Sequence, residues 1–499
     1  MSAKGARGAL APALALLCFG LMLLAAVLWY LQLKADMALL FHSDSDYLPA
    51  LYRDLVEQHG RLSQWNLTPA PSFLPDWPLF FLVHWLFGDF FHALPAFFVL
   101  QGLLLFGLGL WLLRMAADGL RAAVIAGWSC VLLFHWAMQG LTPYSYFLLS
   151  AFHCGAFLLM LLSLRLQHHQ LHWLLGVVAM LSALSDRLYI LQYAIPALGT
   201  LVCMHWRQGL PWKRAALAIL AGCCAGVLLY RLISRPLHLP WMMSWQAIPA
   251  NLPACYAMLA ESWRGAPLCV LLLGAYYGVL SVLLPGTLLG RGWRIAHPAA
   301  ARLAVFSGLS AAVTLMAVLV SSNVFTVRYF IPLYVLPLLI GPVLLYTSVA
   351  QRWHRYLSGV LAAAAVWMTA AALLPALRDI DQVQPAYYPQ DVACMDQVLA
   401  RHGVHYGIAA YWDAKRVGML SRQRPVIAPY GADLVQMHWI TSESVFQKQY
   451  DFALVSHEPD KALDLAQLIR LNGAPLARVD CAVFDVVVFP RGGLKAGLR

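Results

Sequence analysis

The sequence predicts a polytopic α-helical membrane protein with about eleven transmembrane helices, followed by a small C-terminal α/β soluble domain. Three observations predict this class. Hydrophobic residues make up 61% of the chain and charged residues only 11%, whereas about one quarter of a soluble domain is usually charged. Apolar runs near twenty residues long recur along the chain, and each can cross about 30 Å of hydrocarbon. Beyond residue 377 these runs stop and a mixed, polar sequence begins.

The first apolar run, 10–33, follows two basic residues and could therefore be a secretory signal. Its apolar core is longer than the 7–15 residues or so that are typical of a signal peptide, so we interpret it as an uncleaved first helix. The other predicted helices are 91–113, 121–139, 147–164, 171–185, 188–206, 215–232, 266–288, 303–321, 329–347 and 356–374.

Charge is divided unevenly along the chain. Residues 1–377 hold 21 Lys and Arg against 10 Asp and Glu, whereas residues 378–499 hold 13 of each. The positive-inside bias of membrane proteins accounts for this excess, so no nucleic-acid surface is expected. Basic residues occupy alternate, short connections, which we assign to the cytoplasm: Lys4, Arg7, Arg114, Arg121, Arg165, Arg207, Lys213, Arg214, Arg291, Arg294, Arg302, Arg352 and Arg355. The prediction is a multi-pass protein of the bacterial cytoplasmic (inner) membrane, with its N-terminus inside and its C-terminal domain outside.

The long connections lie on the opposite, exterior side. They are the first loop, 34–90, a second loop, 233–265, and the domain 378–499, which would be periplasmic. Long loops in compact proteins are usually functional or disordered, and the abundance of Trp, Phe and Pro in 34–90 favours function. We therefore expect the working surface on the exterior face.

Seven of the ten acids before residue 378 lie in the first exterior loop, and two of them stand close together just after the first helix. Asp44 and Asp46 are two residues apart and follow His42. Such a pair could share a divalent cation such as Mg or Mn, or one carboxylate could act as a general base while the other tunes it. A solvated polar loop is the alternative for any single acid.

A proline-rich stretch follows in the same loop. Four prolines between residues 69 and 78 predict an irregular, extended path ahead of the second helix. Trp65 and Trp77 could anchor the loop at the lipid headgroups, which is the commoner role, or stack on a sugar, with Asp76 beside them.

Two arginines border the exterior face. Arg187 lies in the turn Ser185-Asp186-Arg187, where a structural ion pair is the alternative to a binding role. Arg328 lies where an exterior loop runs into the next helix. A guanidinium at that depth suits a phosphate or diphosphate, because it offers two parallel donors. Snorkelling to the interface is the alternative.

Together these features resemble the GT-C superfamily of integral membrane glycosyltransferases, which use polyprenyl-phosphate-linked sugar donors. The resemblance is carried by the first helix, the loop with His42-Ser43-Asp44-Ser45-Asp46, the Pro75-Asp76 stretch, Ser185-Asp186-Arg187, Arg328-Tyr329 and the exterior C-terminal domain. It implies a first-loop carboxylate that acts as general base or binds a metal.

By that resemblance Asp44 is the first choice for the base and Asp46 the second. Arg328 would hold the donor phosphate, with Arg187 or Arg53 assisting. The C-terminal domain is small and has no WWD-type acceptor motif, unlike the oligosaccharyltransferase branch, which counts against a peptide acceptor.

The C-terminal domain alternates helical and strand-like segments, which predicts a small α/β domain. The expected helices are 391–402 and 461–471, and the expected strands are 406–411, 425–428, 451–455 and one or two within 479–489. The polar and aromatic segment 411–416 could contact an acceptor glycan, although a packed turn with an ion pair is the favoured interpretation. Cys394 and Cys481 could form a disulfide in an oxidising compartment.

The sequence thus predicts a glycosyltransferase that moves a sugar from a polyprenyl-phosphate donor to a cell-envelope glycan or lipid on the exterior face. A transporter or flippase for a lipid-linked glycan is one alternative, but the acids lie in a loop rather than within helices. A non-catalytic envelope-assembly subunit is the other.

Overall fold

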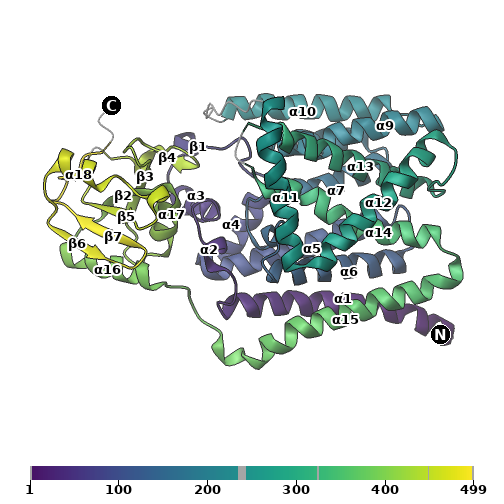
Figure 1. Ribbon diagram of the computed structural model, residues 1–499, viewed down its shortest axis with the longest axis horizontal. Coiled ribbons are helices and arrows are strands. Elements are labelled where there is room, and N and C mark those ends of the chain that lie inside the picture. The colour runs from purple at the N-terminus through teal and green to yellow at the C-terminus, as the bar shows by residue number, and fades with distance from the viewer. Residues whose placement is uncertain (1–2, 234–242, 323–324, 448, 497–499) are drawn as a thin grey trace.

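A helical bundle is joined through its last long helix to a small α/β domain (Figure 1). The computed structural model describes residues 3–233, 243–322, 325–447 and 449–496. Within these residues, eight helices are long and apolar enough to cross a membrane. A polytopic helical protein with a small sheet region near its C-terminus is therefore confirmed.

The long helices match eight of the predicted runs to within a few residues. They are α1 (Ala3–Leu31), α5 (Phe90–Leu113), α6 (Gly119–Met138), α10 (Lys213–Ile233), α12 (Pro267–Leu289), α13 (Pro298–Leu319), α14 (Ile331–Ser348) and α15 (His354–Arg378). Two of the predicted cytoplasmic charges, Lys4 and Arg7, have side chains outside the described part of the chain.

Of the remaining three predicted runs, two form shorter helices and the third, 188–206, is helical throughout. The shorter helices are α7 (Cys154–His168) and α8 (His172–Ser185), of 15 and 14 residues, and the third run contains α9 (Ile195–Gln208). At 1.5 Å per residue the two shorter helices are about 21–23 Å long, less than the thickness of the hydrocarbon core. A 3₁₀ turn over Tyr144–Leu148 and a left-handed His153 precede α7, whereas a π-helical turn over Ile190–Ala194 runs directly into α9.

The predicted exterior loops contain helices of their own. The first loop holds α2 (Met37–Leu40), α3 (Tyr47–Tyr52) and α4 (Asp76–Phe87), and the second holds α11 (Ile248–Gly265). Residues 234–242 of the second loop lie outside the described residues. Hence the long connections are structured where they are described.

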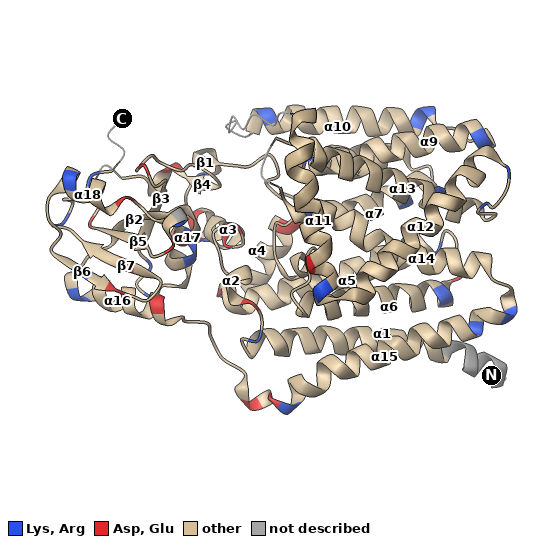
Figure 2. Cartoon of the chain, in the orientation of Figure 1, with Lys and Arg blue, Asp and Glu red and all other residues tan. Residues whose placement is uncertain are grey.

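The first and last long helices lie side by side and run in the same direction (Figure 1). Thr369 on α15 donates to the Cys18 carbonyl on α1, and farther along Gln32 donates to the Ala376 carbonyl at 2.7 Å. The first loop and the C-terminal domain therefore lie at the same end of the bundle. Figure 2 shows acidic segments where the bundle meets the domain and basic segments at the far end of the bundle.

The C-terminal domain contains a five-stranded mixed sheet in the order β3-β2-β5-β7-β6. Strands β2, β3 and β5 are parallel, whereas β7 is antiparallel to both β5 and β6. Successive residues of a strand pack on opposite faces of the sheet. Ala409 and Leu454 lie in the core on one face, and Ile408 and Ala453 lie in the core on the other. The strands are β2 (Tyr406–Ala410), β3 (Val426–Tyr430), β5 (Phe452–Ser456), β6 (Ala477–Asp480) and β7 (Phe484–Val488), and the helices are α16 (Gln390–His402), α17 (Tyr411–Leu420) and α18 (Leu465–Asn472).

Most helices and strands of this domain follow the sequence prediction. Segment 411–416, interpreted as a packed turn, instead forms the first part of helix α17, and the first of the two last strands begins at Ala477, before the predicted range 479–489. A disulfide joins Cys394 on α16 to Cys481, whose Cα atoms are 5.6 Å apart. It ties the first helix of the domain to the turn between β6 and β7.

The first loop is docked on the C-terminal domain. Strand β1 (Trp65–Asn66) pairs antiparallel with β4 (Thr441–Ser442), and the Asn66 amide donates to the Glu443 carboxylate at 2.6 Å. These contacts join segments more than 370 residues apart in sequence, so the loop and the domain together form one surface at this end of the bundle.

Candidate functional site

The segment that carries the acid pair is a tight turn held by its own small polar side chains. The Ser45 hydroxyl donates to the His42 carbonyl at 2.8 Å, and the His42 ring Nδ1 accepts from the Asp44 backbone N–H at 3.1 Å. The Ser43 hydroxyl donates to the Tyr411 carbonyl, so this turn is attached to the start of α17. The sequence His-Ser-Asp-Ser-Asp thus fixes both carboxylates against the C-terminal domain.

Asp44 lies between a hydroxyl of the domain and a guanidinium of the bundle. Its Oδ1 accepts from the Tyr411 hydroxyl at 2.5 Å, and its Oδ2 is 3.6 Å from Arg328 Nη1. The Asp44 side chain is 17% exposed and that of Arg328 is 23% exposed, so both remain accessible. Burial and Asp44 raise the pKa of Tyr411 well above its usual range, which keeps the hydroxyl protonated as a donor. The structure therefore brings together Asp44 and Arg328, which lie far apart in sequence.

Asp46 has a different environment. It is fully buried, and neither carboxyl oxygen has a hydrogen-bond partner among the described residues. Burial raises its pKa well above the usual range, although Arg416, Lys415 and Arg53 act in the opposite direction. Burial disfavours the charged form that a base or a metal ligand needs, so the two acids of the pair are not equivalent.

Lys415, one helical turn after Tyr411, completes this cluster. Its amine is buried 4.5 Å from the centre of the Tyr411 ring and has no hydrogen-bond partner among the described residues. Burial lowers its pKa to about 7, while Asp44 and Asp46 act to raise it. We call the five residues Asp44, Asp46, Arg328, Tyr411 and Lys415 the loop–domain site.

Two members of the loop–domain site were assigned no catalytic role from the sequence. The favoured interpretation of 411–416 was a packed turn with an ion pair, and Arg416 does pair with Asp391 at 2.7 Å. Tyr411 and Lys415 instead face the first loop. The available signal was their spacing of four residues, which places both on one face of a helix.

The fold explains why α17 presents these residues. It starts directly after β2, at the carboxyl ends of the parallel strands β2, β3 and β5. Ligand sites in open α/β sheets form at such ends. At the other end of α17, Arg53 donates to the carbonyls of Gly418 and Met419, where the helix dipole favours a cation. Arg53 therefore anchors α17 rather than facing a donor phosphate.

Arg187 has separate surroundings. Its guanidinium carbon lies 4.2 Å from the centre of the Tyr230 ring. No described hydrogen bond or ion pair links it to the loop–domain site, and Asp186 pairs with His153 at 2.5 Å rather than with Arg187. The structural ion pair expected in this turn thus involves a histidine.

The two tryptophans of the first loop have partners within the protein. Trp65 is 4% exposed and donates to the Asp54 carboxylate at 2.5 Å. The Trp77 indole donates to the Pro71 carbonyl at 2.8 Å. Trp65 is therefore unavailable to a glycan. The exposed aromatic ring beside the loop–domain site is Trp412, which is 44% exposed and 6.1 Å from the His42 ring.

Other acids of the first loop have structural partners. Asp36 and Asp89 cap α2 and α5 through backbone N–H groups, and Glu57 lies 3.5 Å from Arg424. Asp76 is 2% exposed at the start of α4, and burial together with Asp186 raises its pKa to about 7. Asp44 differs from these acids because it lies between the Tyr411 hydroxyl and the Arg328 guanidinium, where the bundle meets the domain.

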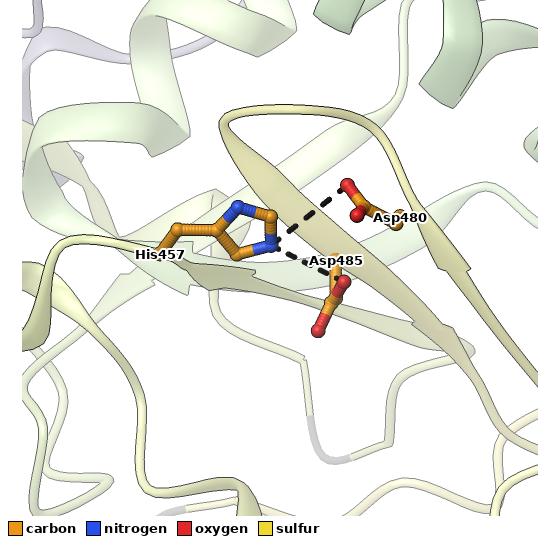
Figure 3. A group of neighbouring side chains, drawn as sticks. All are labelled: His457, Asp480 and Asp485. Atoms are coloured by element: carbon orange, nitrogen blue, oxygen red, sulfur yellow. Dashed lines mark hydrogen bonds and ion pairs between the residues drawn. The ribbon is translucent and has the colours of Figure 1, made fainter.

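The only group of three possible metal ligands among the described residues lies elsewhere in the domain. Figure 3 shows His457 with Asp480 and Asp485, at 4.0 and 3.3 Å from the His457 ring nitrogen. Arg478 already pairs with Asp485 at 2.5 Å. Asp44 and Asp46 belong to no such group of three within the described residues, and Asp44 lies 3.6 Å from Arg328 Nη1.

No family model, curated protein or solved structure matches this chain. The geometry of the loop–domain site is therefore the basis for its function.

Proposed function

We propose that the chain is a membrane glycosyltransferase that moves a sugar from a polyprenyl-phosphate donor to a cell-envelope glycan or lipid. The observation that carries this proposal is the position of Asp44, between the Tyr411 hydroxyl and the Arg328 guanidinium, where the bundle meets the domain.

Each part of the reaction has a candidate group in the site. Asp44 takes the proton of the acceptor hydroxyl as that oxygen bonds to the sugar carbon. The bond from the sugar to the lipid phosphate breaks, and the electron pair leaves with the phosphate. Arg328 stabilises the negative charge that develops there, because a guanidinium can donate twice to phosphate. Asp46 is fully buried, which raises its pKa, and it supports the turn instead of sharing the chemistry.

The charge of the departing phosphate is balanced by protein cations in this proposal. Arg328 is directly available, and Lys415 adds charge behind Tyr411 when it is protonated. A Mg or Mn ion shared by Asp44 and Asp46 would require ionisation of the fully buried Asp46. We therefore expect a chelator to leave transfer unchanged, and loss of transfer on chelation would restore the metal hypothesis.

Trp412 is the proposed platform for a sugar ring. It is exposed at the edge of the site, and aromatic faces pack against the apolar faces of sugars. Both the first loop and the domain would lie on the exterior side of the cytoplasmic membrane, with the donor's lipid tail among the helices.

The test is incubation of the purified full chain with a panel of polyprenyl-phosphate-linked sugars and envelope acceptors, scored for release of lipid phosphate. Release that depends on acceptor is the expected result. A flippase would move the donor across a vesicle bilayer with its sugar–phosphate bond intact. A non-catalytic assembly subunit would do neither, and either outcome would contradict the proposal.

A further inference from the structure

A cavity of about 240 Å³ with mixed polar and apolar walls lies at the end of the bundle opposite the loop–domain site. It is formed by the C-terminal halves of α7 and α9 together with the starts of α8, α10 and α13. Its polar lining is Gln167, His168, Gln170, His172, Thr200 and Arg302.

The cavity is surrounded by positive charge without acidic partners. Arg302 lines it, with one guanidinium nitrogen 3.4 Å from the His168 ring. Within the described residues, Arg302 forms no ion pair, and the same holds for the nearby Arg165, Arg207, Lys213 and Arg214. The single acid in the basic connections at this end, Asp118, is paired with Arg121 at 3.1 Å. An anion is the ligand that this charge favours.

Two buried side chains contribute further hydrogen-bonding groups. Gln167 is only 7% exposed, and its carbonyl oxygen accepts from the Tyr193 hydroxyl at 3.2 Å. The His172 ring nitrogen Nδ1 is buried and has no hydrogen-bond partner in the described part of the chain. Unpaired buried polar groups are rare in folded proteins, so a polar ligand is expected to satisfy this nitrogen.

An apolar groove of about 470 Å³ begins beside the cavity and runs between α8 and α10. His172 lines both spaces. Small residues line its floor, and they let the two helices approach closely: a Cβ at Gly222 would lie 2.4 Å from the Gly176 carbonyl oxygen. Trp173 and Leu217 form its rim and are 73% and 68% exposed, as lipid-facing residues of a membrane protein are.

We propose that an anionic phospholipid binds here, with its phosphate in the Arg302 cavity and a hydrocarbon chain in the α8–α10 groove. Basic pockets between membrane helices bind anionic lipid headgroups in this manner. The contiguous groove selects a lipid over free phosphate, because it offers apolar surface that inorganic phosphate cannot use. This proposal stands apart from the glycosyltransferase proposal, since it uses no residue of the loop–domain site.

The experiment measures the thermal unfolding of the purified full chain in a neutral detergent while phosphatidylglycerol, phosphatidylcholine or inorganic phosphate is added. We expect phosphatidylglycerol to stabilise the wild type at a concentration at least tenfold lower than phosphatidylcholine. Arg302→Gln should weaken this apparent affinity about tenfold or more, as expected for loss of a charge-assisted contact. Arg291→Gln removes an exposed arginine from the same end without touching the cavity, and should bind as the wild type does.

Ala221→Phe fills the groove from its exposed rim and leaves the cavity intact. It should lose the response to phosphatidylglycerol even if Arg302→Gln fails to fold. Equal stabilisation by the two phospholipids would overturn the proposal. An equal loss of apparent affinity for phosphatidylglycerol in Arg302→Gln and Arg291→Gln would also overturn it. Stabilisation by inorganic phosphate as strong as by phosphatidylglycerol, unaffected by Ala221→Phe, would assign the cavity to free phosphate instead.

Discussion

At the scale of single residues, the environment separates two acids that look equivalent in the sequence. Asp44 is partly exposed, accepts from Tyr411 and faces Arg328, whereas Asp46 is fully buried without a hydrogen-bond partner in the described structure. The difference comes from contacts with residues more than 280 positions away. Spacing within one loop carries no information about such contacts, so the sequence could rank the two acids only by resemblance.

Arg328→Ala should raise the donor KM while the chain still folds. The lost contact is charge-assisted, worth roughly 1.5–3 kcal/mol, which corresponds to about a 10- to 100-fold change. Initial rates against donor concentration measure it. Arg187→Ala serves as the control, because Arg187 stacks on Tyr230 and should leave the donor KM unchanged. An unaltered KM in Arg328→Ala would contradict the phosphate role.

The buried amine of Lys415 should make donor binding depend on pH. Its amine has a pKa lowered by burial to about 7, so it is charged below that pH and neutral above it. Loss of this positive charge should raise the donor KM as the pH rises through 7, by on the order of fivefold for a charge interaction of about 1 kcal/mol. Lys415→Met should show the higher KM at every pH.

Asp76 provides the control for that titration, because burial and Asp186 raise its pKa to about 7 as well. Asp76→Asn should retain the change of KM near pH 7. If Asp76→Asn loses this change and Lys415→Met keeps it, the titrating group is wrongly assigned.

At the scale of secondary-structure elements, hydrophobicity predicted where helices lie but not how long each one is. The eight long helices follow from apolar runs alone. In the run 147–164 a left-handed His153 delays the start of the helix, and in the run 188–206 a π-helical turn interrupts the α-helical pattern; neither leaves a mark on hydropathy. The α/β alternation of the C-terminal domain was predictable because its strands and helices have distinct periods.

Close packing of α8 on α10 predicts a position-specific effect of glycine substitution. A Cβ at Gly226 would lie 2.3 Å from the Met180 carbonyl oxygen, whereas a Cβ at Gly278 in α12 meets nothing within 4 Å. Gly226→Ala should therefore lower the unfolding temperature in detergent, because overpacking costs roughly 1–3 kcal/mol of folding free energy. Gly278→Ala should leave it unchanged or raise it, since alanine favours helix by about 1 kcal/mol. Equal effects would argue against the described packing.

At the scale of the whole molecule, the parallel first and last long helices place the first loop and the C-terminal domain at one end. Gln32, the residue directly after α1, donates to the carbonyl of Ala376 near the end of α15. This arrangement allows residues near both ends of the sequence to form one site. Asp44 and Arg328 were predicted as functional, but Tyr411 and Lys415 were not, because their contacts depend on how the domain docks on the loop.

The orientation in the membrane follows as a prediction from the basic residues at the far end of the bundle. A single cysteine placed at Val56, which is 43% exposed in the first loop, should react with a membrane-impermeant maleimide in intact cells. One placed at Arg352 should react only after the cells are opened, because the positive-inside bias assigns that end to the cytoplasm. The unmodified chain gives the background. The opposite labelling pattern would place the loop–domain site in the cytosol and remove the proposed donor geometry.

The most direct measurement of the central proposal compares lipid-phosphate release by the wild type, Asp44→Asn and Asp89→Asn. Asparagine at 44 keeps the shape and an acceptor for Tyr411 but is no base, so release should fall by about a hundredfold or more. Asparagine at 89 makes the same chemical change in the same loop and retains the helix cap, so release should stay at the wild-type rate. Equal release by Asp44→Asn and the wild type would contradict the assignment of Asp44 as the base of a glycosyl transfer.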